Sequence, residues 1–169
     1  MIYLRLMKFF LVIEVQQCES GNFISHSKYA SEILKIFNVS NCKKSPMLVI
    51  TSLKLSKDDD GSTVDPMLFK RLVGSLMYLT RTRPDIMYGV SLISRFMESP
   101  KDSHWQAGKI ILRYVSGTKV PGIMYSTSEN FKLTGYTDSD NGGITDDRKS
   151  TYGYTFHFGI DVVSWDSKK

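Results

Sequence analysis

The spacing of apolar residues changes along this chain, from a helical period in the middle to a strand period in the last third. Asp65 and Pro66 form a helix start, because a carboxylate can cap free backbone amides and proline suits the first helical position. The apolar residues that follow at helical spacing are Phe69, Leu72, Val73, Leu76 and Leu79. A second helix is expected from Pro84, and a third over roughly 103 to 116 with Gly117 after its end.

Short strands are expected in the last third, where the period shortens to that of a strand. They cover 122–126, 132–138, 150–158 and 162–165, and the last three are expected to pair as an antiparallel meander. Near the N-terminus, 9–15 reads as one strand that returns as 23–25 through a turn at 18–22, and Ser27 reads as the cap of a helix. The sequence therefore predicts the α+β class, with an N-terminal β-hairpin and helix, a helical middle and a final antiparallel sheet.

Length and composition fit one globular domain. The 169 residues are 41% hydrophobic, which is too apolar for a disordered tail. A net charge of +5 is compatible with nucleic acid, but solvated Lys and Arg faces are the more common reason for such a charge. Cys18 and Cys42 match no zinc spacing, and Glu14 interrupts the N-terminal run that would otherwise resemble a signal peptide. No stretch approaches the about 20 apolar residues of a membrane span. We therefore expect an intracellular protein, cytoplasmic or nuclear, with no membrane partner.

Asp138 is the candidate metal ligand, in the stretch LTGYTDSDNGG at 133–143. Alternation along a strand places it on one face with Thr134 and Tyr136. Two-metal cleavage of phosphodiesters needs several carboxylates, and a single acid on a strand more often meets solvent. The neighbouring acids are not placed to join it: Asp140 falls in a turn, Asp146 and Asp147 lie beside Arg148 and Lys149, Asp161 is expected in a tight turn and Asp166 just after a strand.

A basic and aromatic face is the other candidate site. Lys109 and Arg113 share the third predicted helix with Trp105, and Lys101 lies just before that helix. Such a face suits a nucleic-acid backbone, and it suits an ordinary amphipathic helix equally well. The sequence shows no nucleophile elbow and no phosphate-binding glycine loop, so no small-molecule substrate is evident.

Long, ordered motifs run through nearly the whole chain. They are LMKFFLVIEVQQCESGNFISHSKYASEILKIF at 6–37, RLVGSLMYLTRTRPDIMYGVSLISRFMESPKDSHWQAGKIILRYVSGTK at 71–119, and the stretch from LTGYTDSDNGG to VVSWDSKK at 133–169. The first resembles the end of the reverse-transcriptase palm and the adjoining thumb of copia-type retrotransposon polyproteins. The second resembles the region that joins polymerase to nuclease in those polyproteins, and the third resembles the beginning of their ribonuclease H domain.

This resemblance implies a division of the chain into the end of the reverse transcriptase at 1–49, a linker at 50–65, a helical connection region at 66–126 and a truncated ribonuclease H-like domain at 127–169. It also implies that Asp138, in YTD, corresponds to the first metal-binding carboxylate of the nuclease, which uses Mg²⁺ in the parent family. The other acids of the family are expected beyond 169, and the paired aspartates of the polymerase before Met1. Asp138 is therefore expected to be vestigial, and the fragment to need no cofactor.

Several positions depart from the family pattern. Val12 stands where glycine is usual, and Arg81 stands where a small residue is usual before TRPD. A charge such as Arg81 inside a packed helix would destabilise the fold unless it reaches solvent or a partner. Ile110, Asn141 with Gly142, and Asp166 are further departures. They suggest a reading frame that has drifted after insertion in a host genome, expected to be a plant.

Two functions of different classes follow. The first is a remnant of a retrotransposon polyprotein, of reverse transcriptase and ribonuclease H lineage, without catalysis of its own. The second is a small non-enzymatic binding module, which either binds nucleic acid such as an RNA–DNA hybrid or has been recruited by the host as an interaction protein.

Overall fold

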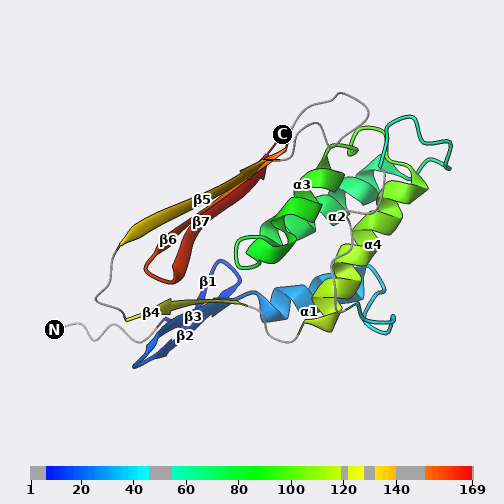
Figure 1. Cartoon of the computed structure of the whole chain (residues 1–169). Helices are drawn as coiled ribbons and strands as arrows, with labels where there is room; N and C mark the ends of the chain where they lie inside the picture. The colour runs from blue at the N-terminus through cyan, green and yellow to red at the C-terminus, as the bar shows by residue number, and fades with distance from the viewer. Residues whose placement is uncertain (1–6, 46–54, 119–121, 128–131, 140–150, 169) are drawn as a thin grey trace.

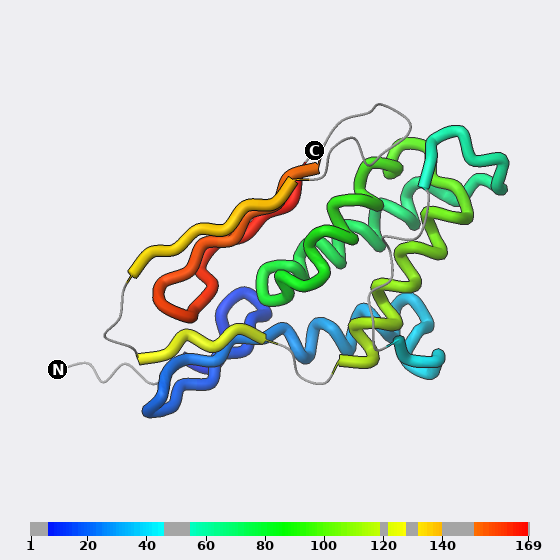
Figure 2. Tube along the Cα trace, viewed as in Figure 1, coloured from blue at the N-terminus to red at the C-terminus, as the bar shows by residue number. Residues whose placement is uncertain are grey.

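The computed structural model describes residues 7–45, 55–118, 122–127, 132–139 and 151–168, and within them the fold is α+β as predicted (Figures 1 and 2). Two antiparallel sheets and four α-helices are present in these ranges. The elements in chain order are β1 (Phe9–Phe10), β2 (Ile13–Cys18), β3 (Gly21–Ser25), α1 (Ser27–Ile36), α2 (Pro66–Leu79), the 3-10 turn η1 (Pro84–Ile86), α3 (Met87–Ser94), α4 (Asp102–Gly117), β4 (Gly122–Ser126), β5 (Leu133–Ser139), β6 (Tyr152–Phe158) and β7 (Asp161–Lys168).

The N-terminal sheet has the strand order β1-β2-β3-β4. The predicted hairpin is confirmed as β2 and β3, but the prediction of one strand over 9–15 is wrong. The chain turns back at Leu11 and Val12, which have φ angles of 46° and 67°, so that Phe10 pairs with Ile13. Two-residue turns of this kind usually contain asparagine and glycine. An apolar, β-branched sequence gives no such signal, and the turn was therefore missed.

Strand β4 joins the N-terminal sheet and not the final meander. Its register runs from Gly21 opposite Ser126 to Ser25 opposite Gly122. Both glycines are needed for this close pairing, because a Cβ atom on Gly122 would lie 2.3 Å from the Ile24 carbonyl oxygen and one on Gly21 would lie 2.1 Å from the Tyr125 carbonyl oxygen. The strand at 122–126 was predicted correctly, but nothing local in the sequence indicates its distant partner.

The core lies among the four helices. The predicted start of α2 is confirmed, since the Asp65 carboxylate accepts a hydrogen bond from the Met67 amide at 2.9 Å. All five residues of the predicted α2 stripe are buried, and they pack with residues of α1, α3 and α4 that include Ile33, Val90, Ile93, Ile111 and Leu112. Gly108 allows α4 to approach α2, because a Cβ atom there would lie 2.5 Å from Leu72 Cδ2.

The predicted helix ends need small corrections. Pro84 begins the 3-10 turn η1, and α3 follows from Met87. Helix α4 includes Gly117, with Thr118 as its C-cap residue. Ser27 is the first residue of α1 and not its cap, a position that His26 occupies without a side-chain capping bond. The one-residue differences at α1 and α4 reflect the frayed hydrogen bonding of helix ends, whereas the second predicted helix loses its first three residues to η1.

The segment Thr82–Asp85 forms a polar connection inside the helical part. Arg83 is 2% exposed, and its Nε and Nη2 atoms donate to the two Asp85 oxygens at 2.8 and 2.6 Å. The Tyr114 hydroxyl of α4 also donates to Asp85, at 2.9 Å. The neighbouring Arg81 is exposed, so its charge reaches solvent and need not be buried.

The C-terminal sheet is the predicted meander, with the strand order β5-β6-β7. It packs alongside α3 (Figure 1). Trp165 Nε1 donates to the Thr80 carbonyl at 3.0 Å and Ser91 Oγ donates to the Ser167 carbonyl at 2.7 Å, which fixes β7 to the helices. Asp161 and Asp166 both belong to β7, so their predicted places in a turn and after a strand are wrong. Among the described residues, no helix is long and apolar enough to cross a membrane.

Candidate functional site

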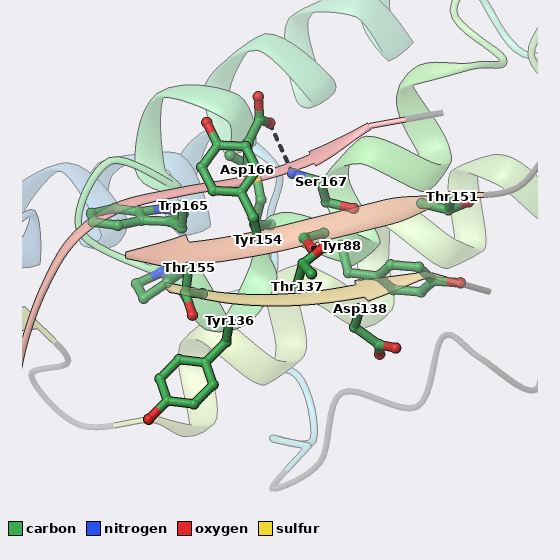
Figure 3. Close-up of a pocket in the computed structure, with 13 residues that line it drawn as sticks. Tyr88, Tyr136, Thr137, Asp138, Thr151, Tyr154, Thr155, Trp165, Asp166 and Ser167 are labelled. Atoms are coloured by element: carbon green, nitrogen blue, oxygen red, sulfur yellow. Dashed lines mark hydrogen bonds between the residues drawn. The ribbon is translucent and has the colours of Figure 1, made fainter. Parts of the chain in front are cut away.

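A cavity of about 550 Å³ lies between α3 and the C-terminal sheet. Met87 and Tyr88 line it from the α3 side, and Tyr136, Asp138 and Trp165 line it from the sheet (Figure 3). The cavity forms because the sheet docks through β7, where Trp165 and the Ser167 backbone make their hydrogen bonds. Asp138 is therefore one of the residues that line this cavity.

The strand register decides which side chains share this space. Asp138 pairs with Gly153, and Gly153 pairs with Ser167, so these three residues lie on one face of the sheet. Tyr136 and Trp165 lie on the same face in the next row, both paired with Thr155. This agrees with the predicted sharing of one face by Thr134, Tyr136 and Asp138.

Asp166 lies on the opposite face. It pairs with Tyr154, and Figure 3 shows both side chains extending away from the side on which Tyr136 and Asp138 extend. Its carboxylate contacts Lys168 Nζ at 2.7 Å and accepts a hydrogen bond from the Ser167 amide at 2.8 Å. The hydrogen bond and charge of Asp166 raise the pKa of the Lys168 ammonium. Asp166 is thus paired within its own strand and does not assist Asp138.

Asp161 is also engaged elsewhere. Its carboxylate accepts hydrogen bonds from the amide and the hydroxyl of Ser126 at 2.8 Å, and so ties β7 to β4. Asp140, Asp146 and Asp147, which the sequence placed in polar loops, lie outside the described residues.

The donor set at Asp138 does not fit a two-metal centre. A pair of Mg²⁺ ions needs bridging and flanking carboxylates in octahedral geometry. Within the described ranges, no group of three or more His, Cys, Asp or Glu side chains is placed to hold a metal ion. One strand-borne carboxylate can supply only part of a single coordination shell. The vestigial metal role of Asp138 stays a prediction.

The predicted basic face lies on α4 and is partly assembled. Trp105, Lys109 and Arg113 are four residues apart and lie along one side of the helix. Lys109 Nζ lies 5.4 Å from the centre of the Trp105 ring. Lys101 precedes the helix, and its backbone amide donates to His104 Nδ1 at 2.9 Å. The other edge of Trp105 meets Phe37 at 6.2 Å between ring centres. Trp105 thus also flanks the core, and nucleic-acid binding by this face stays a prediction.

Sequence reasoning missed the aromatic residues of the cavity. Trp165 was read only as part of a strand, and Tyr88 only as part of a helix. Their proximity depends on how the sheet docks on α3, a contact between segments about 75 residues apart in the chain that no local pattern specifies. The only local sign of this cavity in the sequence was the strand alternation that places Tyr136 and Asp138 on one face of β5.

Comparisons with known proteins point to mobile elements. No protein-family model matches the chain, and no solved structure matches it. A retrovirus-related Pol polyprotein from transposon RE2 of Arabidopsis thaliana is 38% identical over 95% of this chain and 11% of its own length. The Pol polyprotein from transposon TNT 1-94 of Nicotiana tabacum is 40% identical over 86% of this chain and 11% of its own length. An uncharacterized mitochondrial protein of Arabidopsis thaliana is 36% identical over 95% of this chain and 67% of its own length.

These matches define a class, that of polyproteins encoded by retrovirus-like transposable elements. Within that class the chain belongs to the copia-type retrotransposon Pol polyprotein family, as the resemblance predicted. It spans 11% of the length of the transposon polyproteins that it matches.

Proposed function

We propose that this chain is a Pol polyprotein remnant that covers the join between reverse transcriptase and ribonuclease H and has no nuclease activity of its own. The N-terminal sheet and α1 correspond in this proposal to the end of the polymerase. Strands β5 to β7 correspond to the first three strands of the nuclease. The order of the motifs along the chain and the meander topology of β5-β6-β7 support the assignment.

One observation carries the proposed inactivity. On the sheet face that carries Tyr136 and Trp165, Asp138 has the only carboxylate among the described residues, because the register turns the Asp166 side chain to the other face. Asp166 is nevertheless also among the residues that line the cavity. A water nucleophile and a leaving oxygen would both need a cation in a two-metal reaction. A single carboxylate cannot position both cations.

The test is a cleavage assay on a labelled RNA–DNA hybrid with Mg²⁺ and, separately, Mn²⁺. The purified chain should release no product above the no-enzyme background, while a complete ribonuclease H in a parallel tube should digest the hybrid. Product formation that disappears in the Asp138→Asn variant and persists in a matched Asp58→Asn variant would contradict the proposal. Asp58 is a suitable control because it is exposed and lies in the loop before α2.

The second candidate function is nucleic-acid binding through α4. The observation that favours it is the row of Trp105, Lys109 and Arg113, in which Lys109 stacks over the indole ring. Phosphate contacts weaken steeply with salt. Binding to an RNA–DNA hybrid at about 50 mM salt that falls at about 200 mM salt is expected under this function. It should also fall in a Lys109→Ala/Arg113→Ala variant. If that variant binds the hybrid as well as the wild type does, α4 is not the nucleic-acid-binding surface.

A further inference from the structure

The cavity between α3 and the C-terminal sheet is lined by aromatic residues and by two acidic residues, Asp138 and Asp166. Tyr88 comes from α3, Tyr136 from β5 and Trp165 from β7, and all three line the cavity with Asp138 (Figure 3). The volume of about 550 Å³ falls within the range of small-molecule sites, roughly 300–1,000 Å³. The cavity is therefore large enough for a compact organic ligand.

The charge of the cavity is negative. None of the described residues that line it is Lys, Arg or His. The Asp138 carboxylate has no ion pair or hydrogen bond to another described side chain, whereas Asp166 is paired with Lys168 on the other face. Of the described cations near the lining residues, Arg95 Nη2 donates to Thr151 Oγ1 at 2.9 Å and Lys168 pairs with Asp166. An anionic ligand next to Asp138 would be repelled by its carboxylate. A cationic ligand is favoured on charge alone.

The aromatic walls select among cations. Ring faces carry negative quadrupole potential and attract ammonium and guanidinium groups. Mg²⁺ retains its water shell and needs several oxygen ligands, so rings and one carboxylate suit it poorly. An alkylated ammonium group is weakly hydrated and carries apolar methyl groups, which fit against Met87 and the rings. We propose that this cavity binds a small organic cation through an alkylated ammonium group placed between these rings and opposite Asp138.

The residues that carry this proposal can be varied without removing the supports of the fold. Asp138 is exposed, and Tyr88 is 39% exposed. Trp165 is kept, because its indole nitrogen bonds the Thr80 carbonyl and fixes the sheet. Its indole Nε1–H also provides a reporter at the cavity. The second tryptophan, Trp105 on α4, provides an internal reference outside it.

The experiment is a titration followed by ¹H–¹⁵N NMR, with choline as the probe. The Trp165 indole signal should shift and saturate, while the Trp105 signal stays in place. The neutral analogue 3,3-dimethylbutan-1-ol, which has the same shape without the charge, should bind about 2- to 5-fold more weakly, the range of a cation–π contact near solvent. A peptide with trimethyllysine is the second probe. If the peptide binds more tightly than choline, the ligand of this cavity is a methylated side chain of another protein. If the peptide binds more weakly than choline, the ligand is a free small molecule.

Three variants complete the test. Asp138→Asn should weaken choline binding by about 2- to 5-fold, the range of an exposed charge pair, and Tyr88→Leu should weaken it similarly. Asp58→Asn, which removes the same charge away from the cavity, should change nothing. Equal affinity for choline and its neutral analogue would overturn the proposal. Equal effects of Asp138→Asn and Asp58→Asn, or displacement of choline by equimolar Mg²⁺, would also overturn it.

Discussion

Folding buries His26 and changes the titration of its imidazole. It is 1% exposed, its Nδ1 lies 2.8 Å from Thr82 Oγ1, and its Nε2 has no partner among the described residues. The rings of Tyr29 and Tyr78 pack against it at 5.9 and 5.0 Å between centres. Burial lowers the pKa of His26 below its ordinary 6.5, although the Glu14 carboxylate partly offsets this. The folded state therefore favours the neutral imidazole more than the unfolded chain does.

This shift predicts a loss of stability on acidification. Below about pH 6.5 the unfolded chain binds a proton on His26 that the folded chain resists, so the free energy of unfolding should fall as pH drops from 7.5 to 5.5. Urea unfolding at both values measures this. In a His26→Gln variant the difference between the two pH values should shrink, and in a His157→Gln control it should persist. A wild-type difference that survives His26→Gln unchanged would refute this assignment.

Asp85 carries the second prediction at this scale. Burial alone would raise the pKa of its carboxyl, but the hydrogen bonds and charge of Arg83 and the Tyr114 hydroxyl hold that pKa below its ordinary value. Asp85→Asn leaves the Arg83 guanidinium buried without its carboxylate. Because the Asp85 side chain is 37% exposed, we expect a loss of about 2 kcal/mol, below the range for a fully buried pair.

Thermal and urea unfolding at pH 7 would measure the Asp85→Asn effect. The lowered pKa of Asp85 means that its contribution is present above the unfolded-state value of about 4 and is lost at lower pH. The variant and the wild type should therefore converge in stability toward pH 3. A constant difference at all pH values would show that the loss comes from packing and not from charge.

At the scale of elements, the β1–β2 turn is the least favourable local structure. Leu11 and Val12 both have positive φ angles, which cost an L-residue roughly 1–2 kcal/mol each. Both side chains are more than half exposed, so little burial offsets that cost. Glycine, usual at the Val12 position in the family, has no such penalty.

Val12→Gly should therefore stabilise the protein, by about 1 kcal/mol after the entropic cost of glycine. Val15→Gly is the matched control, because Val15 lies within β2 in an ordinary strand conformation. It should destabilise the protein. The midpoint of urea unfolding measures both changes. A destabilising Val12→Gly would mean that the turn is not formed as described.

The elements that sequence predicted well are those specified by local signals. The cap at Asp65 and the stripe from Phe69 to Leu79 lie within one helix, and the meander is built from neighbouring strands. The partner of β4 and the cavity wall from α3 could not be predicted, since they depend on contacts between distant segments. Asp138 was found from its strand pattern. Its separation from Asp166 depends on the register of β7, and the strand predicted there ended at 165, before Asp166, whereas β7 continues to Lys168.

At the scale of the whole molecule, the C-terminal sheet depends on the helices for one face. Its other face is open, with Tyr152, Phe156 and Phe158 each more than 40% exposed. A three-stranded sheet needs packing on at least one face to be stable. Trp165→Phe removes the hydrogen bond from the indole Nε1–H to the Thr80 carbonyl, which then keeps only the bond from the Arg83 amide at 3.3 Å. Hydrogen exchange should therefore become faster in β5 to β7 and remain slow in α2. Equal acceleration in both parts would indicate that the two unfold as one unit.

Among the described residues, Asp138 carries the single carboxylate on its face of the C-terminal sheet. Counting bound Mn²⁺ ions at this site is the most direct test, by isothermal titration together with paramagnetic broadening of the Asp138 and Gly153 amide signals. We expect at most one weakly bound ion, which is lost in Asp138→Asn. Two ions bound with similar affinity, both lost in Asp138→Asn, would contradict the account.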